Sequence, residues 1–516
     1  MTLPPAARPG VLLAIAGYAL IIVVIGAWSA LRTRDARDFF IAGQRLGLWV
    51  TGVATMSSAF SGFVFIGGPG LTYRLGMSSL FICLPVGFTA ALLCWTVGRR
   101  LRLLAEVREV YTIPDALACR FGSPAATSLS AAAIVVGSIG YLAAQLLALG
   151  VLLEAALGTR ETWGETGLAL AIGAGLLIVV GYSFIGGMVA GAYTDLVQGL
   201  LMMTTAVLVF GSAVHAAGGL SQIGTSIAAS PAFGDAFLEP LGRASAWTAF
   251  GLFFVFGVGT LGQPHMLHKF FMLDDPRKLR WLPSVLAGSQ TLSLLMWVGL
   301  GLAVPALVAQ GRMDPLEHPD EATPAFLLHF ASEPLAGLAI AGALAAIMST
   351  ADSFLNIAAA ALVRDLPRAL GRPLRRELAW GRWATLAVGG AAGAAAWLYG
   401  DLIALLGTFA FGTFAAALAP VLAVGLCWER VHARAAVASI ATGLSLNLIL
   451  ELIRTRTQLA DSPWWPLTAE IPPACLALAA SFVVLLAVSL LVRSPSHGRG
   501  GDQHEIDDDV RLALSL

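Results

Sequence analysis

Residues 46–70 read LGLWVTGVATMSSAFSGFVFIGGPG, an apolar run that is long enough to cross a membrane but has polar and small residues at its middle. The middle residues are Ser57, Ser58, Ser61 and Gly62. A second such run, FGVGTLGQPHMLHKFF at 256–271, contains three glycines and a proline close together. Lipid offers the backbone no hydrogen bonds, so irregular backbone at this depth must be buried in protein and usually has a function. We therefore expect two interrupted helices, whose freed carbonyl oxygens could replace the water shell of a cation.

The composition of the whole chain agrees with a membrane location. Of its 516 residues, 57% are hydrophobic and only 12% are charged, and the mean hydropathy is +0.80. A soluble domain carries about 25% charged residues. These values exclude a soluble enzyme, a disordered scaffold and a nucleic-acid binder, and the net charge of zero gives no field that would attract an acidic partner. The five cysteines stand far apart, so we expect neither a disulfide framework nor a metal cluster.

Long apolar runs predict an all-α polytopic protein with about thirteen membrane helices. The runs cover 10–31, 46–73, 77–98, 126–156, 166–184, 187–215, 245–271, 282–309, 325–363, 379–399, 401–427, 433–453 and 472–492. The longest segment outside the membrane, 216–244, is expected to carry a surface helix, and the polar tail 493–516 is expected to be disordered.

Basic residues set the predicted orientation. With these spans, 24 of the 31 Lys and Arg residues fall in loops on one side of the membrane and 7 on the other. Loops rich in Lys and Arg stay in the cytoplasm. The pattern predicts an odd number of spans in the cell membrane (the inner or plasma membrane), with the N-terminus outside and the C-terminus in the cytoplasm.

Two further spans contain polar side chains in apolar surroundings. Asp195 lies in GGMVAGAYTDLVQG, and a carboxylate inside a membrane is a functional hypothesis by default. The span AGALAAIMSTADSFLNIAAA at 341–360 carries one face of small and hydroxyl residues at helical spacing, with Asp352 on the adjoining face. That face comprises Ala346, Ser349, Thr350 and Ser353. Hydroxyl and carbonyl oxygens suit a hard monovalent cation such as Na⁺.

The other polar groups do not favour an enzyme. His265 and His268 have no carboxylate or cysteine near them in sequence that would complete a metal shell. We expect Lys269 and the DDPRKLR loop after it to anchor the chain at the membrane interface. The sequence contains no HExxH, GxSxG or GxxxxGK(S/T) motif, so the protein is predicted to be a non-enzyme.

Six segments together resemble the sodium:solute symporter family, and the closest local matches are to its sodium/proline branch. They are DFFIAGQRLG at 38–47, 46–70, TIPDALACRFG at 112–122, GYSFIGGMVAGAYTDLVQG at 181–199, LGQPH at 261–265 and AAIMSTADS at 345–353. The resemblance implies a single transport domain with a LeuT-like core of five plus five inverted-repeat helices at 46–427. One extra helix at 10–31 would precede this core, and two at 433–492 would follow it.

The family likeness also implies site residues. The principal Na⁺ site would take the carbonyls of Ser57, Phe60 and Ala346 and the hydroxyls of Ser349 and Thr350. Asp195 would belong to a second ion site or an ion-exit path, to which we also assign Asp352 and Ser353. The solute would lie between the two interrupted helices, near Ser61, Gly62, Phe63, Tyr141, Gln145, Phe256, Thr260 and Gln263.

The resemblance implies a Na⁺-coupled symporter that imports a small organic solute, an amino acid such as proline or a carboxylate, by alternating access. Na⁺, the solute and the lipid bilayer are its expected partners, and no obligate protein partner is evident. The proline branch carries Asp, Trp and Tyr where this chain has Ala59, Phe256 and Thr260. A proton-coupled carrier on the same fold and a membrane sensor built on a transporter scaffold remain as alternatives.

Overall fold

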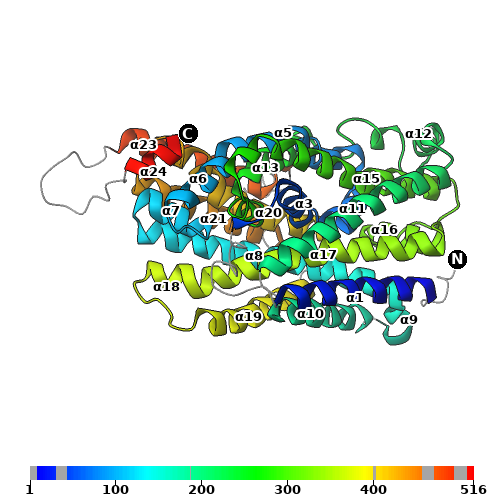
Figure 1. Ribbon diagram of the computed structural model, residues 1–516. Helices are drawn as coiled ribbons and strands as arrows, with labels where there is room; N and C mark the ends of the chain where they lie inside the picture. Colours follow the sequence, from blue (N-terminus) through cyan, green and yellow to red (C-terminus); the bar gives the residue numbers. More distant parts are fainter. Residues whose placement is uncertain are drawn as a thin grey trace, which may run out of the picture.

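The computed structural model describes residues 9–30, 44–164, 166–185, 188–398, 402–455, 470–492 and 508–515. Within these ranges the regular structure is helical, and the one strand-like contact is an isolated bridge between Leu46 and Leu273. Figure 1 shows the long helices lying side by side in a bundle. The prediction of an all-α membrane protein is confirmed.

Most predicted spans coincide with helices. The helices that cover them are α1 (Pro9–Ala30), α3 (Leu48–Ala59) with α4 (Gly68–Leu75), α5 (Val86–Leu92) with α6 (Arg99–Val107), α8 (Pro124–Leu157), α10 (Thr166–Ile185), α11 (Met188–Ala216), α13 (Ala246–Val258) with α14 (Pro264–Phe270), α15 (Leu282–Ala309), α17 (Glu333–Ala360), α19 (Glu377–Leu398), α20 (Ile403–Pro420), α21 (Ala433–Thr455) and α23 (Pro473–Leu491). By length and hydropathy alone, eight helical segments of the described chain can cross a membrane, and α13 with α14 makes a ninth. The total of thirteen membrane helices, and the limits of the core and of the helices that flank it, stay predictions.

One predicted span consists of two helices in the structure. The run 325–363 divides into α16 (Ala322–His329) and α17, because Ser332 starts a new helix whose first turn contains a proline. The predicted surface helix within 216–244 is confirmed as α12 (Leu220–Ala228).

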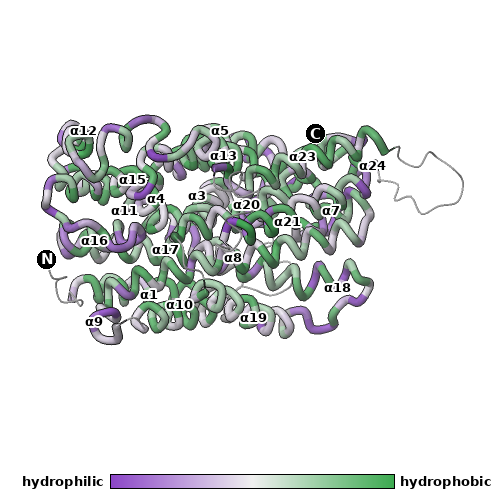
Figure 2. The backbone as a smooth tube through the Cα atoms, turned by 180° about the vertical axis from the view of Figure 1, so that it is seen from behind, coloured by the Kyte–Doolittle hydropathy of each residue, from purple (hydrophilic) through white to green (hydrophobic). Residues whose placement is uncertain are grey.

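Three long helices form the centre of the bundle. In the most apolar windows of α8, α17 and α20, 78%, 83% and 89% of the residues are buried, against 33% for α21 and 39% for α23. The central helices pack against one another and against the interrupted helices, so they are the scaffold that positions the site. The tube in Figure 2 is mostly hydrophobic along the long helices and more hydrophilic at the two ends of the bundle.

The basic segments gather at one end of the bundle. Helix α1 begins at the opposite end from α6, α7 (Ile113–Phe121), α18 (Leu366–Ala369) and α24 (Asp508–Ser515). Two arginines at this end are buried and bind backbone carbonyls that end helices or turns: Arg102 Nε donates to Leu273 O at 2.7 Å, and Arg120 Nε donates to Gly425 O at 3.1 Å. Arg102 and Arg120, which were counted among the loop charges, are therefore buried residues that stabilise the fold.

The end of the tail is ordered, in contrast to the predicted disorder of 493–516. Residues 508–515 form α24, which packs against α6. Asp509 accepts two hydrogen bonds from Arg108, at 2.5 and 2.9 Å, and the Leu514 carbonyl accepts one from Arg100 at 2.9 Å. Residues 493–507 lie outside the described part of the chain.

Close packing of α21 on α20 generates a stability prediction. A Cβ atom on Gly443 would lie 2.0 Å from the carbonyl oxygen of Ala416, whereas a Cβ on Gly390 in α19 would meet nothing within 4 Å. We expect Gly443→Ala to destabilise the protein by about 1–3 kcal/mol through overpacking. Gly390→Ala should be neutral or stabilising, because alanine favours a helix over glycine. Thermal unfolding of both variants in detergent measures the difference, and equal melting temperatures would contradict the close approach.

Candidate ion and solute sites

The helix that begins at Leu48 stops in the middle of its span, as predicted. Helix α3 ends at Ala59, Phe60 takes the extended backbone angles φ −98° and ψ 113°, and a π-helical turn begins at Phe63. The amide nitrogen of Gly62 donates to Gln145 Oε1 on α8 at 2.9 Å, and the amide of Phe63 donates to Ser61 Oγ at 3.1 Å. Side chains thus satisfy backbone donors that the break has freed.

The second predicted interruption is also confirmed. Helix α13 passes into a 3₁₀ turn over Gly259–Gly262, Gln263 is extended, and α14 starts with Pro264 after a bend of 41°. The side-chain amide of Gln263 donates to the carbonyl of Gly259 at 3.2 Å and to that of Phe411, on α20, at 3.0 Å. Gln263 thus connects the second break to α20, as Gln145 connects the first break to α8.

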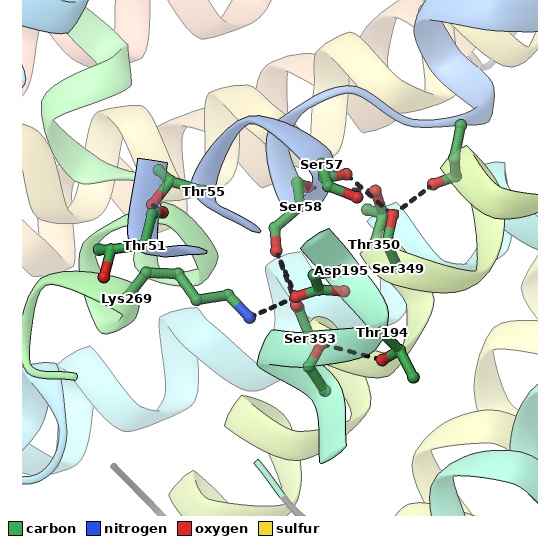
Figure 3. A network of polar contacts seen from close by, with 12 residues as sticks. Thr51, Thr55, Ser57, Ser58, Thr194, Asp195, Lys269, Ser349, Thr350 and Ser353 are labelled. Atoms are coloured by element: carbon green, nitrogen blue, oxygen red, sulfur yellow. Dashed lines mark hydrogen bonds and ion pairs between the residues drawn. The ribbon is translucent and has the colours of Figure 1, made fainter. Parts of the chain in front are cut away.

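Oxygen atoms of α3 and α17 meet next to the first break. Ser349 Oγ lies 2.9 Å from the Ser57 carbonyl oxygen and 3.2 Å from that of Ala346. Thr350 Oγ1 donates to the Ser58 carbonyl at 3.1 Å. Figure 3 shows these groups facing one another across the two helices. Four of the five residues predicted to bind Na⁺ therefore contribute to one oxygen cluster, and the fifth, Phe60, lies at the break itself.

A buried ion pair lies beside this cluster. Lys269 Nζ, on α14, is 2.6 Å from Asp195 Oδ2, on α11, and both side chains are only 2% exposed. Ser58 Oγ lies 3.4 Å from the same carboxylate oxygen and 3.0 Å from Ser353 Oγ. Figure 3 shows this network on the other side of Ser58 from Ser349. Because Lys269 balances the charge of Asp195, the carboxylate can remain ionised in an apolar interior.

The prediction that Lys269 is an interfacial anchor is wrong. Its ammonium group lies in the protein interior because the buried carboxylate of Asp195 requires a counter-charge. Two features of the sequence could have indicated this: an unpaired acid in one span, and a lysine followed directly by the apolar residues Phe270–Leu273.

Asp352 is buried on α17, next to Ser353 in sequence, and it faces α11. A Cβ atom on Gly191 would lie 3.0 Å from Asp352 Oδ2. Its carboxylate thus lies against the helix that carries Asp195. The structure brings all three residues of the predicted second ion site or exit path to the α11–α17 interface.

The eight residues predicted to bind the solute divide into two groups. A cavity at the two breaks is lined by four of them: Phe63, Tyr141, Phe256 and Thr260. The other four, Ser61, Gly62, Gln145 and Gln263, take part in the hydrogen bonds that stabilise the breaks. A direct role for them in solute binding stays a prediction.

Aromatic rings form much of the cavity wall. Phe63 stacks on Phe256 with 5.6 Å between ring centroids, and Phe256 stacks on Phe411 at 4.3 Å. Trp297 of α15 meets Phe63 edge-on at 5.6 Å, and its indole N–H donates to Thr72 at 2.9 Å. Helix α15 also contributes Gln290 to the lining. The contribution of α15 could not be predicted from the sequence, because this uninterrupted helix has no feature that indicates a site.

His265 is packed among aromatic rings. His265 packs against Phe354 with 4.5 Å between ring centroids and against Tyr141 at 5.9 Å. In the described ranges, no group of three or more His, Cys, Asp or Glu side chains is arranged to hold a metal ion.

The buried ion pair generates a prediction for stability. Lys269→Met should leave Asp195 as an uncompensated buried charge and destabilise the protein by about 3–5 kcal/mol. The neutral double variant Asp195→Asn/Lys269→Met should recover most of this loss, because no charge then remains unpaired. Thermal unfolding in detergent measures all three proteins. A double variant that is no more stable than Lys269→Met would contradict the pairing.

Several known transporters are similar to this chain in sequence. The chain is 28% identical to a sodium/proline symporter of Haemophilus influenzae, over 93% of this chain and 94% of the relative. It is 29% identical to the high-affinity proline transporter PutP of Bacillus subtilis (92% and 97% covered) and 27% identical to a sodium/pantothenate symporter of Escherichia coli (85% and 90% covered).

Solved structures share the fold. A Na⁺-coupled sialic acid symporter in a substrate-bound, outward-open state superposes with a TM-score of 0.75 at 17% identity, covering 94% of this chain and 98% of the other. Mhp1, a nucleobase-cation-symport-1 family transporter, gives a TM-score of 0.57 at 13% identity, with 89% and 95% covered. The model of the sodium:solute symporter family matches residues 39–443. The chain therefore belongs to the sodium:solute symporter family.

Proposed function

We propose that this protein imports a small organic solute, an amino acid such as proline or a carboxylate, together with Na⁺. Family membership supports Na⁺ as the coupling ion. The relatives named above are proline and pantothenate transporters, which supports a small solute that carries a carboxylate. The single observation that carries the proposal is the oxygen cluster between α3 and α17, directly beside the cavity at the two breaks.

The cluster has the chemistry of a Na⁺ site. The ion would be held by the carbonyl oxygens of Ser57, Phe60 and Ala346 and by the hydroxyls of Ser349 and Thr350. The separations of 2.9 and 3.2 Å around Ser349 Oγ suit oxygens that share one small cation, since Ca²⁺, an ion of similar radius, takes oxygen ligands at about 2.3–2.6 Å. The site is neutral, so the ion would bring the only net charge to it.

Ion and solute would be coupled through the broken segment of the first interrupted helix. Phe60 supplies a proposed ion ligand through its carbonyl and also lines the cavity. An ion that orders this segment against α17 would raise the affinity for solute, and by linkage the solute would raise the affinity for the ion. The two halves of the core would then rock around the shared site and expose it to the other side.

The driving force is adequate for accumulation. At a membrane potential of about 100 mV, one entering Na⁺ contributes about 2.3 kcal/mol. A tenfold concentration gradient adds about 1.4 kcal/mol, and the sum supports roughly 500-fold accumulation for each coupled ion.

Asp195, Asp352 and Ser353 would form the path by which the ion leaves. A continuous set of polar groups supports this path: Thr350 contacts the Ser58 carbonyl, and the Ser58 hydroxyl contacts both Ser353 and Asp195. The path would lead toward the cytoplasm of a cell in whose inner or plasma membrane the protein lies. The arginine-rich end of the bundle supports this orientation, with the N-terminus outside and the C-terminus inside.

The hydroxyl of Thr350 offers a sharp test of the ion site. Thr350→Val keeps the shape of the side chain but removes the oxygen, and Thr350→Ser keeps the oxygen. We expect Thr350→Val and Ser349→Ala to raise the Na⁺ concentration that gives half-maximal uptake by at least about tenfold, which corresponds to roughly 1.4 kcal/mol of lost ion binding. Thr350→Ser should stay within a few-fold of the parent protein.

Uptake of radiolabelled L-proline and of a panel of other amino acids, carboxylates and sugars into proteoliposomes measures this dependence. Replacing Na⁺ by choline at fixed pH should abolish accumulation. Equal accumulation in choline with a proton gradient would instead establish proton coupling, and an unchanged Na⁺ dependence in Thr350→Val would exclude the proposed site.

A further inference from the structure

The side chain of Gln290 lies in the wall of the solute cavity without a hydrogen-bond partner for its carbonyl oxygen. Gln290 is on α15, it is 4% exposed, and Oε1 is buried and unpaired. A buried acceptor without a partner is unfavourable, and such groups in native proteins require an explanation. Helical spacing places it on one face of α15 with Leu294 and Trp297, and all three line the cavity.

The cavity around Gln290 is rich in hydrogen-bond acceptors. The hydroxyl of Thr260 donates to the Phe256 carbonyl at 2.5 Å, and that of Thr89 donates to the Val86 carbonyl at 3.4 Å. With their protons directed to the backbone, these two oxygens offer lone pairs to a ligand. Together with Gln290 Oε1, the wall therefore presents three acceptors.

The rest of the described cavity wall is uncharged. Phe63, Phe256, Phe411 and Trp297 form a continuous apolar wall, in which Phe256 is stacked between Phe63 and Phe411. Among the described residues that line the cavity, none is Lys, Arg, Asp or Glu. A cationic N–H group of a ligand would thus meet these acceptors without a competing charge from the wall.

We propose that Gln290 accepts a hydrogen bond from the protonated amine of the solute, so that the transported compound is a zwitterionic amino acid and not a carboxylate that lacks an amine. This inference rests on the proposed function and narrows its solute class. Gln290 would determine specificity, because a ligand without the N–H group would leave Oε1 buried and unpaired. The carboxylate of the amino acid would then lie toward the ion at the Phe60 break.

Matched ligands test the inference. L-Proline and cyclopentanecarboxylate differ in the ring amine, and each is added as a competitor to Na⁺-driven uptake of the best-transported compound of the panel. If that compound is an amino acid other than proline, the pair is this amino acid and its deaminated analogue. In the parent protein we expect the amine-bearing ligand to compete at least about tenfold better than its amine-free partner.

Matched variants assign the effect to Gln290. Gln290→Leu should reduce the preference for the amine to less than about threefold, while uptake stays dependent on Na⁺. Gln290→Glu keeps an acceptor at the same place and should retain the preference. Leu292→Met, on the exposed face of the same helix and outside the cavity lining, controls for disturbance of α15 and should leave the preference as in the parent protein.

The outcomes separate this inference from the proposed function. If an amine-free carboxylate is taken up with Na⁺ as well as an amino acid is, symport stands and the inference about Gln290 is wrong. The inference is also wrong if Gln290→Leu keeps the preference, or if Gln290→Glu abolishes binding of the amino acid, since the amide would then act as a donor to the carboxylate. If no compound of the panel is driven by Na⁺, the proposed function itself fails, and this inference fails with it.

Discussion

A helix that stops inside a membrane leaves N–H and C=O groups that lipid cannot satisfy, and the architecture of this protein depends on how that constraint is met at two breaks. Gln145 binds a freed amide of the first break from α8, and Gln263, within the second break, binds a carbonyl of α20, so each break is joined to a central helix. The donors of the first break are thus fixed by protein, whereas its carbonyl oxygens face the hydroxyls of α17. This division leaves an oxygen-rich face for an ion next to a rigidly held backbone.

The buried charges are also compensated by close neighbours. The Asp195–Lys269 pair joins α11 to the second half of the other broken helix, and Ser58 connects the pair to the oxygen cluster. The oxygen cluster is made of neutral groups whose hydrogen bonds an ion can replace, and the ion pair is made of fixed charges. In the proposed mechanism, an entering Na⁺ would therefore change the net charge at the oxygen cluster and meet a compensated charge at the ion pair.

The sequence was informative where residue types depart from the apolar background. Serines and glycines at the middle of one span, and glycines with Pro264 in another, predicted both breaks, and hydroxyls at helical spacing on 341–360 predicted the face that meets the first break. Contacts between side chains of different helices were harder to predict. A contact between α11 and α14 produces no periodic pattern in the sequence of either helix. The sequence therefore predicted an interfacial position for Lys269, which is wrong. Gln290 and Trp297 lie on the uninterrupted α15, where no sequence feature indicates a site. Helix α24 at 508–515 is bound by Arg100 in α6 and by Arg108 directly after it, about four hundred positions away in the sequence.

The proposed coupling between ion and solute would follow from the short distance in sequence between the two sites. The proposed ion ligands and the cavity lining both include residues of the segment 57–60. The carbonyls of Ser57 and Ser58 face α17, while the next two residues, Ala59 and Phe60, already line the cavity. The chain is extended at Phe60, so an ion that binds this carbonyl, as proposed, would also fix the position of the cavity wall. A solute that packs against the wall would in turn favour the conformation that the ion requires. Reciprocal binding of this kind would need no long pathway through the protein, because both ligands would act on the same few residues.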